Sequence, residues 1–260
     1  MDTQNPVIDI QNLYMQYGDN QVLKGINIEV YQGQIVGYIG PNGAGKSTTL
    51  KILIGMLSDF EGYVRVLGYD VKKNPLEVKR RIGYVPENAS LYEQLTPLEY
   101  LTFVGRLYKM EESMLEKAAL ELLYLFDLSD SIDKRMNTFS KGMKQKVLLI
   151  SGLIHNPDII FLDEPLSGLD ANAVILVKEI LGKLKNHGKT IFYSSHLMDV
   201  VEKISDRIVV LNHGEIIADG TFDELRSQAS GSLESIFSSL TGNTEETHSK
   251  ADDFIRALGV

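Results

Sequence analysis

The chain has 260 residues, no cysteine and a formal net charge of −9. Its 43% hydrophobic content is enough for a globular core, and the lack of cysteine excludes disulfides and thiolate metal sites. The acidic balance argues against a broad nucleic-acid-binding face, so we expect no nucleic-acid partner. No apolar run reaches the ~20 residues of a membrane span, and the N-terminus lacks the pattern of a secretory signal. We therefore expect a protein inside the cell.

The first part of the chain predicts two β-strands joined by a turn. Apolar and polar residues alternate over 8–13 and again over 26–30, and Gly18-Asp19-Asn20 lies between these segments. Such alternation is typical of strands that bury one face. Two further short strands are predicted over residues 63–67 and 82–85.

A glycine-rich loop follows the apolar run Ile35–Ile39 and matches the pattern G-x-x-x-x-G-K-[ST]. In this pattern backbone N–H groups surround phosphate oxygens, the lysine reaches the β- and γ-phosphates, and the hydroxyl after it ligates Mg²⁺. A helix predicted over 47–57 directs its N-terminal dipole at the same anion. The alternative is a glycine-rich turn without a ligand. We predict that a nucleoside triphosphate is bound by Gly40, Pro41, Asn42, Gly43, Ala44, Gly45, Lys46, Ser47 and Thr48.

From about residue 95 to residue 154 the pattern becomes helical. Thr96, Pro97 and Glu99 combine an N-cap, a proline at the first helical position and a glutamate at the third. Apolar residues then recur at helical spacing over 115–126, and another helix is expected to begin near Ser140 and end before Pro157. We expect an inserted α-helical subdomain over about residues 88–155.

Beyond this subdomain, short apolar runs alternate with helical segments. The runs cover residues 159–162, 190–193 and 208–211, and the helical segments cover about 172–184 and 197–204. This alternation indicates βα units and a parallel sheet. The predicted fold class is α/β: a P-loop NTPase core with a mixed sheet, an N-terminal antiparallel β subdomain and the inserted helical subdomain.

The end of the chain carries two short apolar faces. One is formed by residues between 233 and 240 and the other by residues between 254 and 258, with a polar segment over 244–250. We expect a C-terminal tail with short amphipathic helices over residues 226–260. These apolar faces have two alternative roles: they dock to a partner, or they cover the chain's own core.

Two adjacent carboxylates end the apolar strand predicted over residues 159–162. A phosphate-loop enzyme requires such a strand beside its loop. Asp163 is expected to hold Mg²⁺, and Glu164 is expected to polarise the attacking water. Paired acids at a strand end are common surface features, so the interpretation depends on the phosphate loop.

With these motifs in place, the chain resembles the ATP-binding cassette (ABC) family over about residues 6–225. The family's signature loop usually reads Leu-Ser-Gly-Gly-Gln, and the corresponding segment here retains Ser140 and Gly142 but has Lys141 and Met143 at the other positions. The resemblance implies ATP as the nucleotide. It also implies that two cassettes, here a homodimer, pack head to tail so that residues 140–143 complete the partner's site.

Three further segments correspond to family motifs. Residues 165–170 resemble the D-loop, so Asp170 is expected at the dimer seam, where it helps to set the attacking water. His196 resembles the switch histidine that contacts the γ-phosphate. Tyr17 resembles the aromatic residue that stacks on adenine, with Val22 beside the ribose. A buried core tyrosine is the alternative for Tyr17.

One position departs from the family pattern in a way that concerns the metal. The loop between the core and the helical subdomain usually carries a glutamine that ligates Mg²⁺, and this chain has Glu87 there. Its carboxylate is expected to reach Mg²⁺ but adds negative charge near the γ-phosphate. A solvent-facing loop carboxylate is the alternative.

The resemblance implies an ATPase subunit of an ABC transporter of the exporter branch, with a separate integral membrane permease. Such a subunit is cytoplasmic and lies on the inner face of the membrane through the permease. We expect the permease to contact residues 87–101, with apolar contacts near Leu91, Tyr92 and Leu95. The alternative is a soluble single-cassette ABC ATPase acting in translation, DNA maintenance or cofactor assembly.

Overall fold

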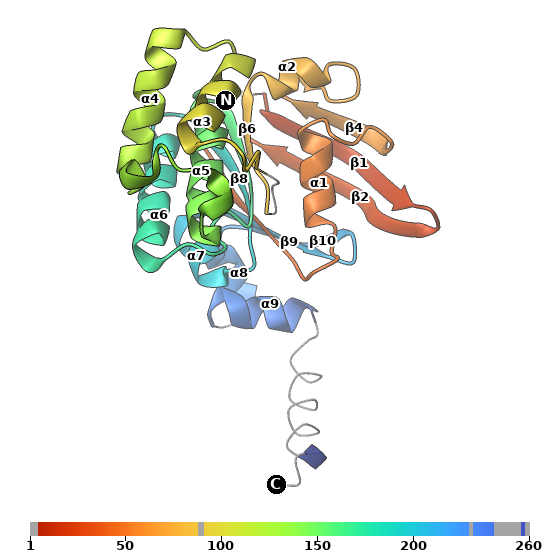
Figure 1. The fold of residues 1–260 in the computed structure, drawn as a ribbon. Coiled ribbons are helices and arrows are strands. Elements are labelled where there is room, and N and C mark those ends of the chain that lie inside the picture. The colour runs from red at the N-terminus through yellow and green to blue at the C-terminus, as the bar shows by residue number, and fades with distance from the viewer. Residues whose placement is uncertain (1–4, 88–90, 229–230, 242–255, 258–260) are drawn as a thin grey trace.

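The computed structural model describes residues 5–87, 91–228, 231–241 and 256–257. It contains a four-stranded sheet and a six-stranded sheet, with helices packed around them. Figure 1 shows the four-stranded sheet at one side and helices α3 to α6 at the other, with the six-stranded sheet between them. Within the described residues, no helix has the length and apolarity that crossing a membrane requires.

The four-stranded sheet is antiparallel and contains the predicted hairpin. β1 and β2 pair from Ile8 opposite Val30 to Tyr17 opposite Asn20. β4 adds to the other side of β1, and β5 forms the edge. The predicted strand, turn and strand are therefore confirmed. The strands are β1 (Ile8–Tyr17), β2 (Asn20–Val30), β4 (Glu61–Val66) and β5 (Tyr69–Asp70).

The six-stranded sheet has the order β10-β9-β3-β8-β7-β6. All neighbouring pairs are parallel except β10 with β9, so the predicted parallel sheet is confirmed. The carboxyl ends of the parallel strands meet at one edge, where ligands bind in such sheets. The strands are β3 (Ile35–Ile39), β6 (Ile82–Val85), β7 (Ile159–Asp163), β8 (Thr190–Ser194), β9 (Arg207–Asn212) and β10 (Glu215–Gly220).

The predicted helices occur in the predicted order, and α2 is an additional helix that the sequence analysis did not predict. A capping box starts α3, because the Glu99 backbone N–H donates to the Thr96 hydroxyl and the Thr96 N–H donates to the Glu99 carboxylate. Two short 3₁₀ turns, Ser129–Ser131 and Met136–Thr138, join α4 to α5. The helices are α1 (Lys46–Leu53), α2 (Pro75–Lys79), α3 (Pro97–Leu107), α4 (Glu112–Leu125), α5 (Lys141–Leu153), α6 (Ala171–Asn186), α7 (Met198–Ile204), α8 (Phe222–Gln228) and α9 (Leu233–Thr241).

Helix α1 is shorter than predicted. The sequence predicted a helix over residues 47–57, and the structure ends it at Leu53. Gly55 has a φ of +68°, and its N–H donates to the carbonyl of Ile52 at 2.9 Å. A left-handed glycine just beyond the last turn is a common helix stop, so the apolar residues after it do not extend the helix.

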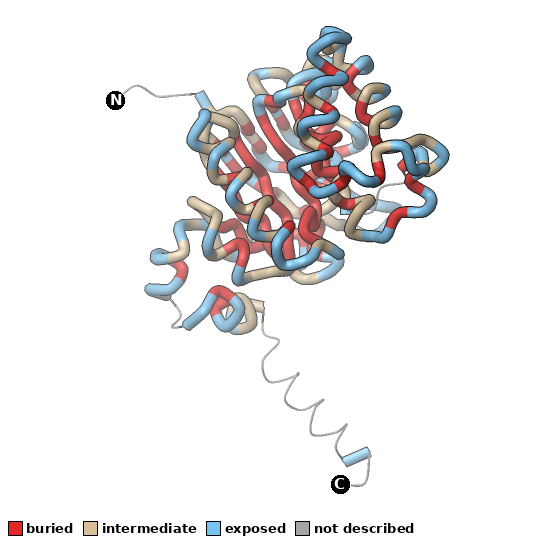
Figure 2. The backbone as a smooth tube through the Cα atoms, turned by 60° about the vertical axis from the view of Figure 1, so that its left-hand side comes forward, coloured by how far each residue is buried: buried red, intermediate tan, exposed pale blue. Residues whose placement is uncertain are grey.

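The core consists of two apolar clusters on the two sides of the six-stranded sheet. One lies between this sheet and the antiparallel sheet together with α1, and includes Ile10, Leu50 and Phe161. The other lies toward α3 to α7 and includes Leu123 and Leu162. Figure 2 shows the buried strands in red, with exposed helical surface outside them. This packing fixes the strand ends that carry the functional side chains.

The C-terminal helix α9 packs against the body of the protein. Its Leu233 and Ile236 side chains are buried, and the Leu233 N–H donates to the Glu202 carboxylate of α7 at 3.0 Å. The first apolar face predicted for the tail therefore covers the chain's own core. The second, over residues 254–258, lies mainly outside the described residues.

Candidate nucleotide-binding site

The main hollow at the carboxyl edge of the parallel sheet has a volume of about 630 Å³. Five segments supply its walls: the start of β2, the phosphate loop with the start of α1, the loop after β6, the end of β7 and the loop after β8. The structure thereby brings together most of the predicted nucleotide and metal residues. The lining residues are Asn20, Val22, Asn42, Gly43, Gly45, Lys46, Ser47, Thr48, Glu87, Asp163, Glu164 and His196.

The phosphate loop requires glycine at specific positions. Gly43 and Gly45 have φ angles of +80° and +110°, a region that favours glycine. A Cβ atom on Gly45 would lie 2.6 Å from Leu23 Cδ2, and one on Gly40 would lie 2.3 Å from the Leu211 carbonyl oxygen. The loop is therefore closely packed on β2 and β9. Of the remaining loop residues, Gly40, Pro41 and Ala44 form its backbone support and do not line the hollow.

Lys46 begins α1 and is almost fully buried. Its Nζ donates to the carbonyl oxygens of Gly40 at 2.7 Å and Pro41 at 3.2 Å. Burial lowers the pKa of the Lys46 ammonium, while Glu164 and the other nearby carboxylates act in the opposite direction. An ammonium held by loop carbonyls is well placed to exchange them for phosphate oxygens.

Asp163 ends β7 and is buried beside the phosphate loop. Burial raises the pKa of its carboxyl, and contact with the Ser47 hydroxyl partly offsets this effect. A carboxylate and a hydroxyl side by side are hard oxygen ligands, and Mg²⁺ uses few protein ligands together with phosphate oxygens. The residues present therefore fit a magnesium ion bound with a nucleotide.

Glu164 has an unusual backbone conformation, with a φ of +48°. Its backbone N–H donates to the Ser194 carbonyl at 2.9 Å. The side chain is buried, and Oε2 lies 3.1 Å from Ser195 Oγ and 2.8 Å from His196 Nδ1. Left-handed backbone at a non-glycine residue costs energy and persists where surrounding contacts impose it. The backbone strain and these two contacts together orient the Glu164 carboxylate in the hollow beside the phosphate loop.

His196 and Ser195 follow the end of β8. The His196 side chain is 65% exposed, whereas Ser195 is buried behind it. Sequence analysis selected His196 but missed Ser195. The available signal in the sequence was its position directly before His196, just after a predicted strand.

The predicted signature residues lie apart from this hollow. Ser140 caps α5 by accepting the Met143 N–H at 3.2 Å, and none of residues 140–143 lines the hollow. Lys141 Nζ donates to Ser167 Oγ at 3.0 Å. A Cβ atom on Gly142 would lie 2.7 Å from the Gly168 carbonyl oxygen, so this end of α5 packs closely on residues 165–170 of the same chain.

Asp170 has a structural role that the sequence analysis did not assign. Its side chain caps α6 by accepting the Ala173 N–H at 2.9 Å, and this hydrogen bond lowers the pKa of the Asp170 carboxyl. Lys146 Nζ lies 3.8 Å from the second carboxylate oxygen. Asp170 is exposed and does not line the hollow.

Tyr17 and Glu87 lie at the periphery of the site. Tyr17 ends β1 and is 49% exposed, so it is not a core tyrosine, although it does not line the hollow as Val22 does. Glu87 lines the hollow, and its charge acts on Lys46 and Asp163. The Glu87 residue is exposed to solvent, although it lines the same hollow as the phosphate loop. Asn20, which also lines the hollow, was not selected from the sequence.

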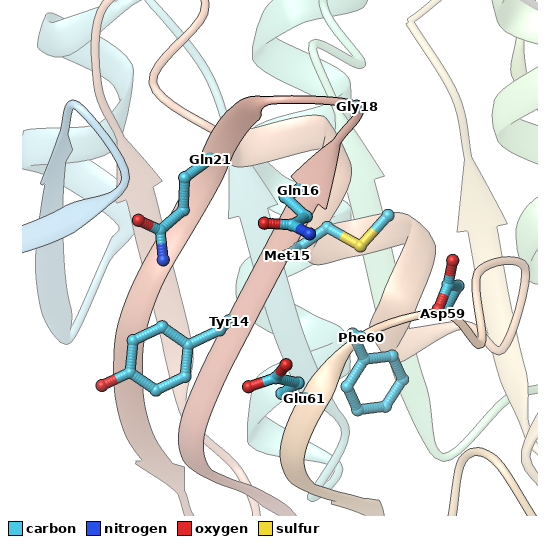
Figure 3. Close-up of a pocket in the computed structure, with 8 residues that line it drawn as sticks. All are labelled: Tyr14, Met15, Gln16, Gly18, Gln21, Asp59, Phe60 and Glu61. Carbon is cyan, nitrogen blue, oxygen red and sulfur yellow. The ribbon is translucent and has the colours of Figure 1, made fainter.

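A second hollow of about 360 Å³ lies beside the hairpin of the antiparallel sheet. Figure 3 shows its lining residues, which come from β1, the turn after it, β2, and the segment that leads into the start of β4. It contains no residue of the phosphate loop. The lining residues are Tyr14, Met15, Gln16, Gly18, Gln21, Asp59, Phe60 and Glu61.

Comparison with known proteins identifies the family. Residues 23–167 match the model of the ABC transporter family. The chain belongs to this family. An uncharacterized ABC transporter ATP-binding protein of Nostoc sp. is 44% identical over 205 residues, which are 78% of this chain and 61% of that protein. The daunorubicin/doxorubicin resistance ATP-binding protein DrrA of Streptomyces peucetius is 36% identical over 220 residues, 85% of this chain and 67% of that protein.

Solved structures of ABC proteins have the same fold. An ATP-binding subunit of an ABC transporter gives a TM-score of 0.84 at 33% identity, covering 90% of this chain and 99% of that chain. A dimeric ATP-binding cassette, MJ0796, in a post-hydrolysis state with ADP and Pi gives a TM-score of 0.76 at 28% identity, covering 82% and 98%. The predicted family, fold class and ATP-hydrolysing transporter component are thereby confirmed. The alternative of a soluble ABC ATPase with another role is not favoured.

Proposed function

We propose that the chain is the ATP-hydrolysing subunit of an exporter whose transmembrane permease is a separate protein. The observation that carries this proposal is the convergence of Lys46, Asp163, Glu164 and His196 on one hollow. The name of the similar DrrA protein, a drug-resistance ATP-binding protein, supports the export direction. The proposed ABC domain covers residues 6–225, with its helical subdomain over about 88–155 and the tail over 226–260.

The residues that line the hollow have different proposed roles in binding and hydrolysing MgATP. Lys46 and the loop N–H groups bind the phosphates, and Ser47 and Asp163 hold Mg²⁺, with Glu87 as a further oxygen ligand. When bound, Mg²⁺ neutralises charge that develops on the phosphate oxygens. Glu164 accepts a proton from the attacking water, and His196 contacts the γ-phosphate. Tyr17 stacks on adenine, with Val22 beside the ribose.

The proposed catalytic unit is a head-to-tail homodimer. Ser140, Lys141, Gly142 and Met143 do not line the hollow of their own chain, and the N-terminus of α5 is suited to an anion. In the dimer, this end of α5 contacts the γ-phosphate bound by the partner subunit, and Asp170 lies at the seam. The dimeric MJ0796 structure with ADP and Pi supports this arrangement.

The proposed permease surface is revised by the burial of individual residues. Leu91 is only 7% exposed and belongs to the core, so it is unsuited to an intermolecular contact. Tyr92 is 64% exposed, and its ring lies 5.8 Å from that of Phe103, which is also exposed. Aromatic side chains are enriched at interface centres. We propose the Tyr92–Phe103 pair as the contact that holds the subunit on the inner face of the membrane.

Co-expression with a candidate permease, a multi-span membrane protein sought in the neighbouring reading frame, tests the proposal. The native chain is expected in the membrane fraction with the permease, and Tyr92→Asp is expected to remain in the supernatant while still binding ATP. A matched control is Tyr124→Asp, because Tyr124 is an exposed tyrosine on α4. Equal recruitment of the native chain and Tyr92→Asp would contradict the proposed surface. Co-purification with ribosomes or DNA would contradict the transporter function.

A further inference from the structure

The loop between β8 and α7 holds a buried hydroxyl next to the proposed base. Ser195 is 1% exposed, and its Oγ lies 3.1 Å from Glu164 Oε2. The backbone N–H of Leu197 donates to the same Oγ at 3.0 Å. Ser195 is therefore fixed both to the backbone that leads into α7 and to the carboxylate.

The two hydrogen bonds of Ser195 define the direction of its proton. A backbone N–H only donates, so the Ser195 oxygen accepts from Leu197, and its single proton is directed to Glu164. Glu164 in turn is an acceptor when ionised. The hydroxyl thus holds Oε2 from the buried side of the carboxylate.

His196 contacts the same oxygen from the solvent side. Its Nδ1 lies 2.8 Å from Glu164 Oε2, and its side chain is 65% exposed. In the proposed mechanism His196 contacts the γ-phosphate, and its contact with Glu164 is then weakened or lost. Ser195, being buried and bound to the Leu197 N–H, does not depend on that movement.

The strand register places Ser195 at this position. Asp163 of β7 pairs with Ser194 of β8, and the Glu164 N–H donates to the Ser194 carbonyl at 2.9 Å. The residues that follow, Glu164 and Ser195, are therefore neighbours. Since Glu164 also has a φ of +48°, its backbone position depends on contacts from β8.

We infer that Ser195 is a positioning residue that keeps the Glu164 carboxylate directed at the attacking water while His196 engages the γ-phosphate. The inference rests on the proposed role of Glu164 as the base. A small displacement of a catalytic group can lower a rate by orders of magnitude, so a buried hydrogen bond to that group contributes to turnover more than to ATP binding.

The test is steady-state ATP hydrolysis by the full chain with MgATP. Ser195→Ala is expected to lower kcat roughly tenfold and to leave KM within about twofold of the native value. Ser195→Cys replaces only the hydroxyl oxygen by the larger sulfur and offers only a weak donor, so kcat is expected to fall to a similar extent, and this variant serves if the alanine variant does not fold. Ser151→Ala is the matched control, because Ser151 is a buried serine whose hydroxyl donates to Leu148 of its own helix.

A double-mutant cycle separates this inference from the proposed function. In the Glu164→Gln background, Ser195→Ala is expected to cause no further loss, because the group it positions no longer acts as a base. Native kcat in both Ser195 variants, a raised KM at unchanged kcat, or the same tenfold loss in the Glu164→Gln background would overturn the inference. Native activity of Glu164→Gln itself would instead overturn the proposed role of Glu164.

Discussion

The phosphate-loop edge of the sheet and the N-terminal end of α5 differ in how complete they are as binding sites. At the first, Lys46, Asp163 and Glu164 are buried and line one hollow. At the second, Ser140 is exposed and its hydroxyl only caps its own helix. The comparison indicates that the chain carries a preformed hollow whose side chains suit phosphates and Mg²⁺. In the proposed dimer, the N-terminal end of α5 is a separate surface that contacts the partner subunit.

The two regions are nevertheless connected within one chain. Gln145 of α5 is buried and donates to the Pro165 carbonyl at 2.9 Å, directly after Glu164. Lys141 contacts Ser167 in the same segment. In the proposed dimer, contact between α5 and the partner's nucleotide is therefore transmitted through these hydrogen bonds to residues 165–167, which follow the proposed base Glu164 of the same chain.

Loss of the buried ammonium is expected to produce the largest effect on the preformed region. Lys46→Ala is expected to weaken ATP binding by about a hundredfold or more, because the phosphates lose their nearest buried cation. Isothermal titration with MgATP measures this loss. Lys51→Ala, an exposed lysine on the same helix, is the matched control. Near-native affinity of Lys46→Ala would contradict the site assignment.

Removal of the proposed base, Glu164, is expected to affect ATP hydrolysis much more than ATP binding. Glu164→Gln is expected to bind ATP with near-native affinity but to hydrolyse it at least a hundredfold more slowly, because the amide does not accept the proton. A closed dimer should then accumulate with ATP, which size-exclusion chromatography detects. Adding Ser140→Arg to this variant should abolish the dimer and retain ATP binding. A folded Glu164→Gln variant that stays monomeric with ATP would contradict the proposed head-to-tail dimer.

Burial predicts opposite outcomes for two neighbouring residues near the proposed permease surface. Leu91→Asp places an unpaired carboxylate in the core and is expected to lower the free energy of unfolding by about 2–4 kcal/mol. Tyr92→Asp changes an exposed ring and should lower it by less than about 1 kcal/mol. Urea denaturation measures both values. Equal stability of the two variants would contradict the burial of Leu91.

The smallest expected effect concerns Glu87, the proposed peripheral metal ligand. Glu87→Gln should retain most ATPase activity, because it keeps an oxygen that reaches Mg²⁺, whereas Glu87→Ala should lower activity severalfold. ATP hydrolysis at limiting Mg²⁺ distinguishes these variants most clearly. Equal activity of both variants and the native chain would favour a carboxylate without a role in the site.

The sequence predicted the preformed region well because its chemistry lies in local motifs. The glycines around Lys46 and the paired acids after β7 are recognisable from short segments. The Ser195–Glu164 contact was not predictable in this way, because it depends on the pairing of β7 with β8, which lie far apart in the sequence. The burial of Leu91 likewise depends on packing of the loop against the helical core rather than on its own segment.

Some elements were missed because their sequence signals are weak. β10 has only a short apolar stretch and is defined by its pairing with β9. The capping role of Asp170 follows from the start of α6 one residue later, whereas the sequence analysis placed that start at about residue 172. Such features require the neighbouring elements to be in place.

Disulfide crosslinking tests the proposed composite site most directly. Because the native chain has no cysteine, only the introduced cysteines can form a disulfide. Asn42→Cys and Ser140→Cys are combined in a Glu164→Gln chain, and each cysteine alone serves as a control. With MgATP, the combined variant is expected to form a covalent dimer on a non-reducing gel, because in the proposed dimer Ser140 of one chain faces the phosphate loop of its partner. An internally crosslinked monomer, with residue 140 joined to residue 42 of the same chain, would contradict the account.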